Sequence, residues 1–207
     1  MTMRSEARAF FGLARHRIGI DGKGVTTLCT FHGCPLRCQY CINPQGLDEK
    51  TTCTYYTPEE LYQRTKVDEL YFLATGGGVV FGGGEPLLHP DFIAKFRTLC
   101  GNDWRLTAES SLYVPKENIL AASECVDDFI VDIKDTDPEI YHRYTGREND
   151  LPLSNLAYLL SLVGSERIFV RLPRIPGYND DKAQQKSKHL LSQMGLTNFE
   201  LFDYTIR

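Results

Sequence analysis

Short apolar segments alternate with helical patterns along almost the whole 207-residue chain. The candidate strands are rich in branched and aromatic residues and lie at residues 25–31, 78–81, 105–110, 128–133, 168–172 and 199–202. The candidate helices lie at about 57–65 with a second piece to 74, and at 91–100, 115–123, 138–144, 152–163 and 181–194. Strands separated by helices predict parallel βαβ units of the α/β class with right-handed crossovers. Such a sheet stays open or curls, and these units are too few for a complete eight-fold barrel.

The first helical pattern has a distinct start, Thr57-Pro58-Glu59-Glu60. Thr57 can act as the N-cap, proline fits the first helical position, and Glu60 completes a capping box. We therefore expect a helix that begins directly after Thr57.

The composition excludes several classes of protein. The net charge is −4, and no run of lysine and arginine is interleaved with aromatic residues, so nucleic acid is not expected as a partner. No segment approaches the ~20 apolar residues of a membrane span, and the amino terminus lacks the apolar core of a signal peptide. We expect a single domain over residues 1–207, located in the cytoplasm and without a membrane partner.

Three of the seven cysteines fall within eight residues, in Cys34-Pro35-Leu36-Arg37-Cys38-Gln39-Tyr40-Cys41. An odd number of cysteines in a cytoplasmic chain does not indicate a disulfide framework, and such a cluster favours metal binding or catalysis. Thiolates select zinc or iron–sulfur clusters. Three thiolates on a four-iron cluster leave one iron without a protein ligand, and that open position can bind a substrate.

Two alternatives remain for the cysteines. A zinc site needs a fourth ligand, and only His32 is near in sequence. Isolated cysteines are commonly inert and buried, and we expect this of Cys29, Cys53, Cys100 and Cys125.

Further candidate residues follow the predicted strands, where parallel α/β folds place their chemistry. The turn Gly82-Gly83-Gly84-Glu85 would let a ligand approach the backbone, with the Glu85 carboxylate nearby. Glu109 ends the third candidate strand. The alternatives are a simple turn and a surface carboxylate.

The fourth candidate strand ends in Asp132-Ile133-Lys134. Strand alternation places Asp132 and Lys134 on one face, where they could bind the ammonium and carboxylate of a zwitterion. Arg171, at the end of the fifth, could hold a carboxylate with both arms of its guanidinium. The alternatives are a structural ion pair and a solvated arginine.

The C-x3-C-x2-C spacing, with an aromatic residue before the last cysteine, resembles the radical S-adenosylmethionine (SAM) superfamily. The resemblance covers about residues 20–204. It implies a partial (β/α)6 barrel, a 4Fe-4S cluster on Cys34, Cys38 and Cys41, and reductive cleavage of S-adenosyl-L-methionine to a 5′-deoxyadenosyl radical. It also implies that Tyr40 contacts the adenine. The turn from Gly83 through Pro86 resembles the motif that holds the cofactor's amino group.

Several segments resemble the activating enzymes of glycyl radical enzymes, of which pyruvate formate-lyase activating enzyme is the type. They are Phe31-His32-Gly33-Cys34, the Asp132–Lys134 strand end followed by a helix leading into Gly146, and Arg171 through Gly177. The resemblance implies that Glu109, Asp132, Lys134 and Arg171 contact the cofactor. It further implies a monovalent cation at Glu109 and Asp132, a glycyl radical enzyme as partner, and flavodoxin or ferredoxin as electron donor.

The chain departs from that pattern at two points. Glu109 stands where these enzymes usually have aspartate, and the last candidate strand ends Phe202-Asp203-Tyr204-Thr205 without the usual histidine. The alternative is a radical enzyme that modifies a peptide or a small molecule, as deazaguanine synthase does. A more distant alternative is a non-enzymatic zinc or electron-transfer module.

Overall fold

The computed structural model describes residues 6–205 and contains one eight-stranded sheet in the order β3-β1-β2-β4-β5-β6-β7-β8. Six neighbouring strands run parallel: β2 (Val25–Phe31), β4 (Gly78–Gly83), β5 (Arg105–Ser110), β6 (Asp128–Asp132), β7 (Ile168–Arg174) and β8 (Phe199–Asp203). They follow one another in chain order, so the predicted series of parallel βα units is confirmed. Within the described residues the sheet does not close, because β3 and β8 each pair on one side only.

Two strands were not predicted. β1 (Arg8–Ile18) pairs antiparallel with β2 and with the short β3 (Thr54–Tyr56). Its register with β2 shifts between Phe10 and Gly12 and again between Ala14 and Arg17. Such bulges interrupt the two-residue alternation by which a half-buried strand is recognised in a sequence.

The helices lie close to the predicted ranges. They are α1 (Pro58–Thr65), α2 (Glu69–Thr75), α3 (Pro90–Cys100), α4 (Lys116–Ser123), α5 (Pro138–Thr145), α6 (Asp150–Val163) and α7 (Asp181–Gln193). The predicted capping box is present: the Glu60 amide donates to Thr57 Oγ1 at 3.3 Å, and the Thr57 amide donates to Glu60 Oε2 at 2.9 Å. No helix in the described part of the chain is long and apolar enough to cross a bilayer.

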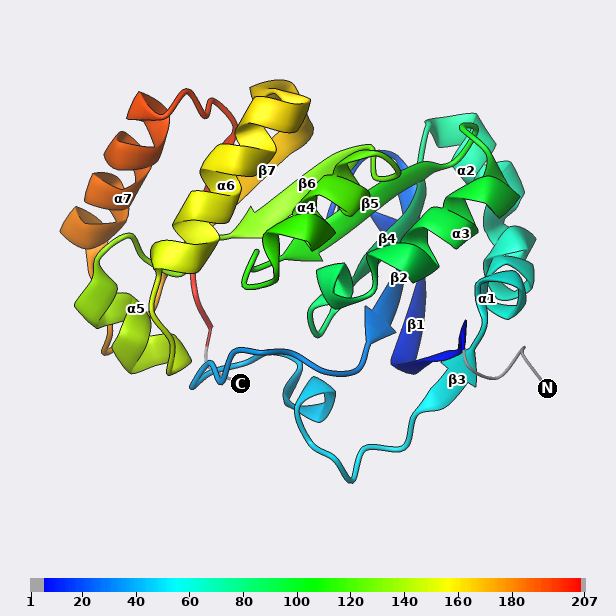
Figure 1. The fold of residues 1–207 in the computed structure, drawn as a ribbon, viewed down its shortest axis with the longest axis horizontal. Coiled ribbons are helices and arrows are strands. Elements are labelled where there is room, and N and C mark those ends of the chain that lie inside the picture. Colours follow the sequence, from blue (N-terminus) through cyan, green and yellow to red (C-terminus); the bar gives the residue numbers. More distant parts are fainter. Residues whose placement is uncertain (1–5, 206–207) are drawn as a thin grey trace.

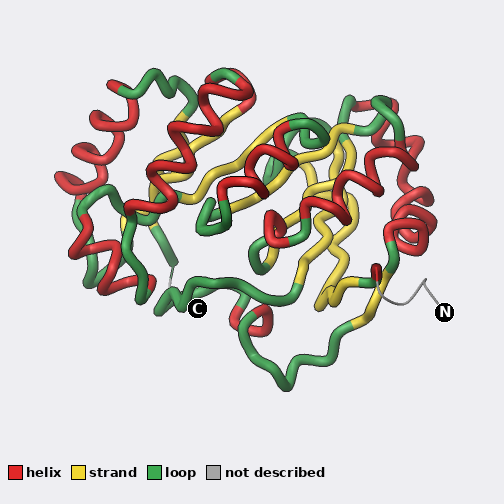
Figure 2. The backbone as a smooth tube through the Cα atoms, viewed as in Figure 1, coloured by secondary structure: helices red, strands yellow, loops and turns green. Residues whose placement is uncertain are grey.

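The two faces of the sheet differ in chemistry. Figure 1 shows α3, α4 and α6 in front of the parallel strands, and Figure 2 shows the same helical layer over the sheet. The side chains in the core include Phe81, Ala108, Phe129, Val131 and Val170. Alternate positions point to the other face. That face therefore receives the polar residues at the carboxyl ends of the strands.

Three of the isolated cysteines, Cys29, Cys100 and Cys125, are buried as expected. Cys53 is only half-buried, so that expectation was wrong for this residue. It lies just before the short strand β3, which is at the edge of the sheet in the described residues. The single-domain assignment of residues 1–207 stays a prediction, and residues 1–5 and 206–207 lie outside the described part.

Candidate active site

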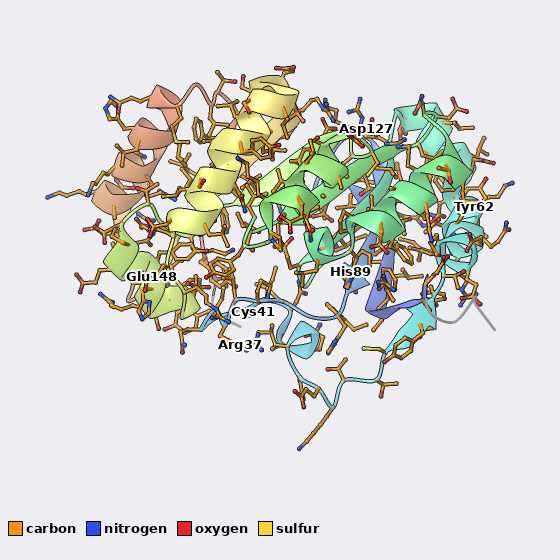
Figure 3. The ribbon with its side chains drawn as sticks, viewed as in Figure 1. Arg37, Cys41, Tyr62, His89, Asp127 and Glu148 are labelled. Carbon is orange, nitrogen blue, oxygen red and sulfur yellow. The ribbon has the colours of Figure 1, made fainter. Side chains whose placement is uncertain are left out.

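The loop that carries the three cysteines runs from the end of β2 to the carboxyl end of α5 (Figure 1). The Arg37 amide donates to the Thr145 carbonyl at 2.9 Å, and the Gln39 amide donates to the Tyr144 carbonyl at 3.1 Å. Arg147 Nε donates to the Pro35 carbonyl at 3.1 Å. In Figure 3, Arg37 and Cys41 lie together on this loop. The carboxyl end of α5 therefore holds the cysteine loop along its length.

The three thiols lie close enough to influence one another electrostatically. Burial raises the pKa of Cys34 to about 12, and the negative charge of Glu85 adds to the effect. Burial raises the pKa of Cys38 to about 11, although the positive charge of Lys134 opposes the rise. A metal that binds thiolates must therefore displace protons from partly enclosed sulfurs.

The donor set fits an iron–sulfur cluster better than a single ion. Among residues 6–205, no three histidine, cysteine, aspartate or glutamate side chains converge as they would around one metal ion. A four-iron cluster is wider than one ion, so its thiolate ligands need not converge on a point. The positive charge of Lys134 beside Cys38 would offset part of the negative charge of a thiolate-bound cluster.

The glycine turn after β4 is packed against the approach to the cysteine loop. The Gly84 amide donates to the Phe31 carbonyl at 2.9 Å, and the Glu85 amide donates to the Gly33 carbonyl at 2.8 Å. A Cβ at Gly84 would lie 2.1 Å from the Gly33 oxygen. Gly83 has φ = 88°, and a Cβ there would lie 2.6 Å from that of Thr30. Both glycines are needed for two backbone segments to come this close.

The Glu85 carboxylate is used within the protein. It is buried and accepts from Ser110 Oγ at 2.7 Å, from the Ser111 amide at 2.9 Å and from Ser111 Oγ at 2.7 Å. It also accepts from the Leu87 amide at 3.2 Å. Burial raises its pKa, although these donors oppose the rise. Both oxygens tie the glycine turn to the end of β5, and a contact of Glu85 with a cofactor stays a prediction.

Asp132 and Lys134 lie on one face, as predicted. Lys134 Nζ is 3.5 Å from Asp132 Oδ1, and the side chains are 15% and 28% exposed respectively. Burial lowers the pKa of Lys134, but the charges of Asp132 and Cys38 outweigh it and raise the pKa to about 12. Lys134 is therefore a permanent cation beside Cys38. Its long contact with Asp132 leaves both groups with bonding capacity for a ligand.

Arg171, by contrast, is already occupied. It donates to Glu109 at 2.7 Å, to Glu200 at 2.8 Å and to the Ile20 carbonyl at 2.8 Å. Burial raises the pKa of Glu109 to about 7, helped by Asp21 and opposed by Arg171. The predicted contact of Arg171 with a carboxylate is thus made within the protein, and its contact with a cofactor stays a prediction.

A cavity of about 490 Å³ lies on the other side of Arg171, toward the amino ends of β6 and β7. Its lining includes Lys23, Asp128 and Phe169 but none of the three cysteines. The cavity is therefore separate from the thiols.

Tyr40 belongs to a group of tyrosines at the mouth of the site. Its ring centroid is 6.2 Å from that of Tyr144 and 5.7 Å from that of Tyr178. The hydroxyl of Tyr204 donates to the Tyr40 carbonyl. Tyr144, Tyr178 and Tyr204 were not predicted from the sequence as residues of the site. Tyr204 directly follows β8, so the rule that strand ends carry chemistry could have found it.

Comparison with known proteins agrees with this site. A family model described as the radical SAM superfamily matches residues 28–186. The (2S)-3-sulfopropanediol dehydratase activating enzyme of Klebsiella oxytoca is 30% identical over 239 aligned positions, which cover 84% of this chain and 74% of the relative. The pyruvate formate-lyase-activating enzyme of Staphylococcus aureus is 30% identical over 194 positions, which cover 89% of this chain and 76% of the relative.

Solved structures agree on the fold. SuiB of Streptococcus suis bound to S-adenosylmethionine has a TM-score of 0.65 at 12% identity, over 86% of this chain and 42% of that chain. Methylornithine synthase, PylB, has a TM-score of 0.61 at 14% identity, over 88% of this chain and 54% of that chain. The chain thus spans about half the length of these structures or less. The predicted partial barrel is confirmed.

Proposed function

Because this chain belongs to the radical SAM superfamily and, within it, to the family of glycyl-radical-enzyme activating enzymes, we propose that it generates a glycyl radical on a partner enzyme. One observation carries the proposal. In the C-x3-C-x2-C loop, Cys38 and Cys41 lie within electrostatic reach of Lys134, which pairs with Asp132, at the strand ends where an α/β fold places its chemistry. A thiolate set and a zwitterion-binding pair meet there.

The cysteines Cys34, Cys38 and Cys41 would hold a 4Fe-4S cluster as thiolates. Such a cluster, when bound, supplies the electron for cleavage of S-adenosyl-L-methionine to methionine and a 5′-deoxyadenosyl radical. The loop is bonded to α5, whose carbonyls at Tyr144 and Thr145 accept from its amides. These bonds would order the three thiolates before a metal binds.

The methionine end of the cofactor carries an ammonium and a carboxylate. Asp132 would accept from the ammonium, and Lys134 would donate to the carboxylate, because both groups are half-buried and incompletely paired. Gly83 and Gly84 bring the backbone of the turn close to the cysteine loop, and Tyr40 would contact the adenine. Arg171 holds Glu109 in place at the edge of the site.

The partner would be a large enzyme whose glycine loop reaches the open side of the sheet. Relatives of this chain are named as activating enzymes of (2S)-3-sulfopropanediol dehydratase, of choline trimethylamine-lyase and of pyruvate formate-lyase. The open sheet, in which β8 pairs on one side only within the described residues, leaves room for a protein substrate. The electron would come from flavodoxin or ferredoxin.

The test uses the full chain, loaded with iron and sulfide without oxygen and given S-adenosyl-L-methionine and dithionite. We expect 5′-deoxyadenosine, and with the correct partner a glycyl doublet in the electron paramagnetic resonance spectrum. Cys53→Ala is the matched control and should retain both signals, whereas Cys38→Ala should lose both. Absence of 5′-deoxyadenosine from the loaded wild type would contradict radical SAM chemistry. Its presence with a covalently modified peptide or small molecule would instead favour the alternative enzyme class.

A further inference from the structure

Tyr141, on α5, carries an unusual hydroxyl group. The residue is 1% exposed. Within residues 6–205, its oxygen is the one buried side-chain nitrogen or oxygen atom that has no hydrogen-bond partner. Leaving such a group unpaired costs about 1–3 kcal/mol. A native protein rarely keeps such a group without a reason, such as a bound group that completes the bond.

The hydroxyl lies within electrostatic reach of the cysteine loop. Burial raises the pKa of Tyr141, and the neighbouring Cys38, Tyr113, Glu85 and Cys34 raise it further. The phenol is therefore a neutral donor at physiological pH and lies within electrostatic reach of two thiols. α5 is also the helix whose last carbonyls hold the cysteine loop, so Tyr141 and the loop are fixed relative to each other.

The Glu85 carboxylate, which is also within electrostatic reach of Tyr141, is already satisfied. Each Glu85 oxygen accepts two hydrogen bonds, from Ser110 and Leu87 on one side and from Ser111 on the other. A carboxylate oxygen with two donors has no further lone pair in a favourable direction. The sulfur atoms of Cys34 and Cys38 are themselves beyond hydrogen-bond distance of the hydroxyl, so the acceptor for the phenol proton would be supplied by a group bound at these cysteines.

We propose that the Tyr141 hydroxyl donates a hydrogen bond to a sulfur of the cluster bound by Cys34, Cys38 and Cys41, and that this bond sets the reduction potential of the cluster. The inference rests on the proposed function. Hydrogen bonds to sulfur stabilise the more negative, reduced form of a cluster, so they raise its potential. Tyr141 is thus a tuning residue and takes no proton during turnover.

The experiment compares wild type with Tyr141→Phe, both as the full chain loaded without oxygen. At a fixed potential, we expect the ratio of reduced to oxidised cluster to fall about tenfold in the variant. A tenfold change in that ratio corresponds to a shift of about 59 mV in the reduction potential of a one-electron couple. We also expect one exchangeable proton coupling to disappear from the electron–nuclear double resonance spectrum of the reduced cluster. Tyr62→Phe, on the far side of the molecule from Cys41 in Figure 3, is the matched control and should change neither.

Thermal unfolding of the metal-free proteins gives an independent test. Because the hydroxyl has no partner in the polypeptide, metal-free Tyr141→Phe should be at least as stable as wild type. A large loss of stability, or failure to fold, would show that the hydroxyl is bonded within the chain and would overturn the proposal. So would a loaded variant with unchanged potential and unchanged proton couplings. If wild type itself takes up no cluster, the proposed function fails instead, so the two failures are distinct.

Discussion

The two ends of β6 carry the same pair of charged groups in different surroundings. Asp128 begins the strand and lies 3.7 Å from Lys23, and Asp132 ends it and lies 3.5 Å from Lys134. Asp128 is buried and also accepts from Arg105 at 2.6 Å. At the other end, Asp132 is half-buried, and its lysine lies beside the Cys38 thiol.

The difference shows that an ion pair by itself does not identify a site. The amino end gathers two cations on one buried carboxylate, which is a structural arrangement. The carboxyl end holds one long, partly open pair next to the cysteine loop. In parallel folds the carboxyl end is the end where ligands bind. Four predictions, each with its own control or comparison variant, test whether stability and function are divided in this way.

The largest effect is expected at the cysteine loop. Cys38→Ala should abolish the visible absorption of a reconstituted cluster and the formation of 5′-deoxyadenosine, because a three-thiolate site has no substitute ligand. Cys125→Ala removes a buried thiol of the core and serves as the control, since it should lower stability and leave cluster loading intact. Equal iron and sulfide content in the Cys38 variant and wild type would refute the assignment.

The next effect is expected at the two lysines. Lys134→Met should raise the KM for S-adenosyl-L-methionine by about 10- to 100-fold, the equivalent of one charge-assisted hydrogen bond. Lys23→Met removes the matching lysine at the amino end and should change KM by less than about twofold. The measurement is 5′-deoxyadenosine formation against cofactor concentration. Equal changes in KM in the two variants would show that the two ends of β6 do not differ in cofactor binding.

A third effect should appear at the amino end and concern stability. Arg105→Met removes the closer partner of buried Asp128 and should lower the free energy of unfolding by about 2 kcal/mol, as expected for a partly solvated ion pair. Lys134→Met should cost less than about 1 kcal/mol, because water can solvate half-buried Asp132. Urea unfolding of the metal-free proteins measures both. A larger loss of stability in Lys134→Met than in Arg105→Met would show that the carboxyl end of β6 is the structural one.

The fourth effect concerns the pH dependence of stability. Burial raises the pKa of Glu109 to about 7, above its ordinary value of 4.5. The folded protein therefore binds more protons than the unfolded chain between these values, and stability should fall as pH rises from about 4.5 to 7. In Glu109→Gln this decline should shrink by about 1–3 kcal/mol, while Glu200→Gln, on exposed Glu200, should keep it. Unfolding midpoints at pH 5 and pH 8 measure the change; parallel curves for all three proteins would refute the role of burial.

The sequence was informative wherever a local pattern determines local structure. Runs of branched residues predicted all six parallel strands, and Thr57 with Glu60 predicted the start of α1. The face shared by Asp132 and Lys134 followed from strand alternation. In each case the residues that decide the outcome are neighbours in the chain, so no knowledge of distant contacts was needed.

The partners of side chains could not be predicted in the same way. Arg171 meets Ile20 and Glu200, and Tyr204 meets Tyr40, across long separations in sequence. Such contacts depend on which faces the folded sheet brings together. The unpaired hydroxyl of Tyr141 depends on the absence of a neighbour, which no motif encodes.

The cysteine loop is bonded to the end of α5 by its own backbone, at Arg37 and Gln39, and to the glycine turn through Gly33. Small metal-binding domains often remain unfolded until the metal arrives. Here the loop becomes ordered when the sheet and α5 form, because its amides bond to carbonyls of α5. Removal of the proposed cluster would therefore leave the polypeptide folded and able to bind a cluster again.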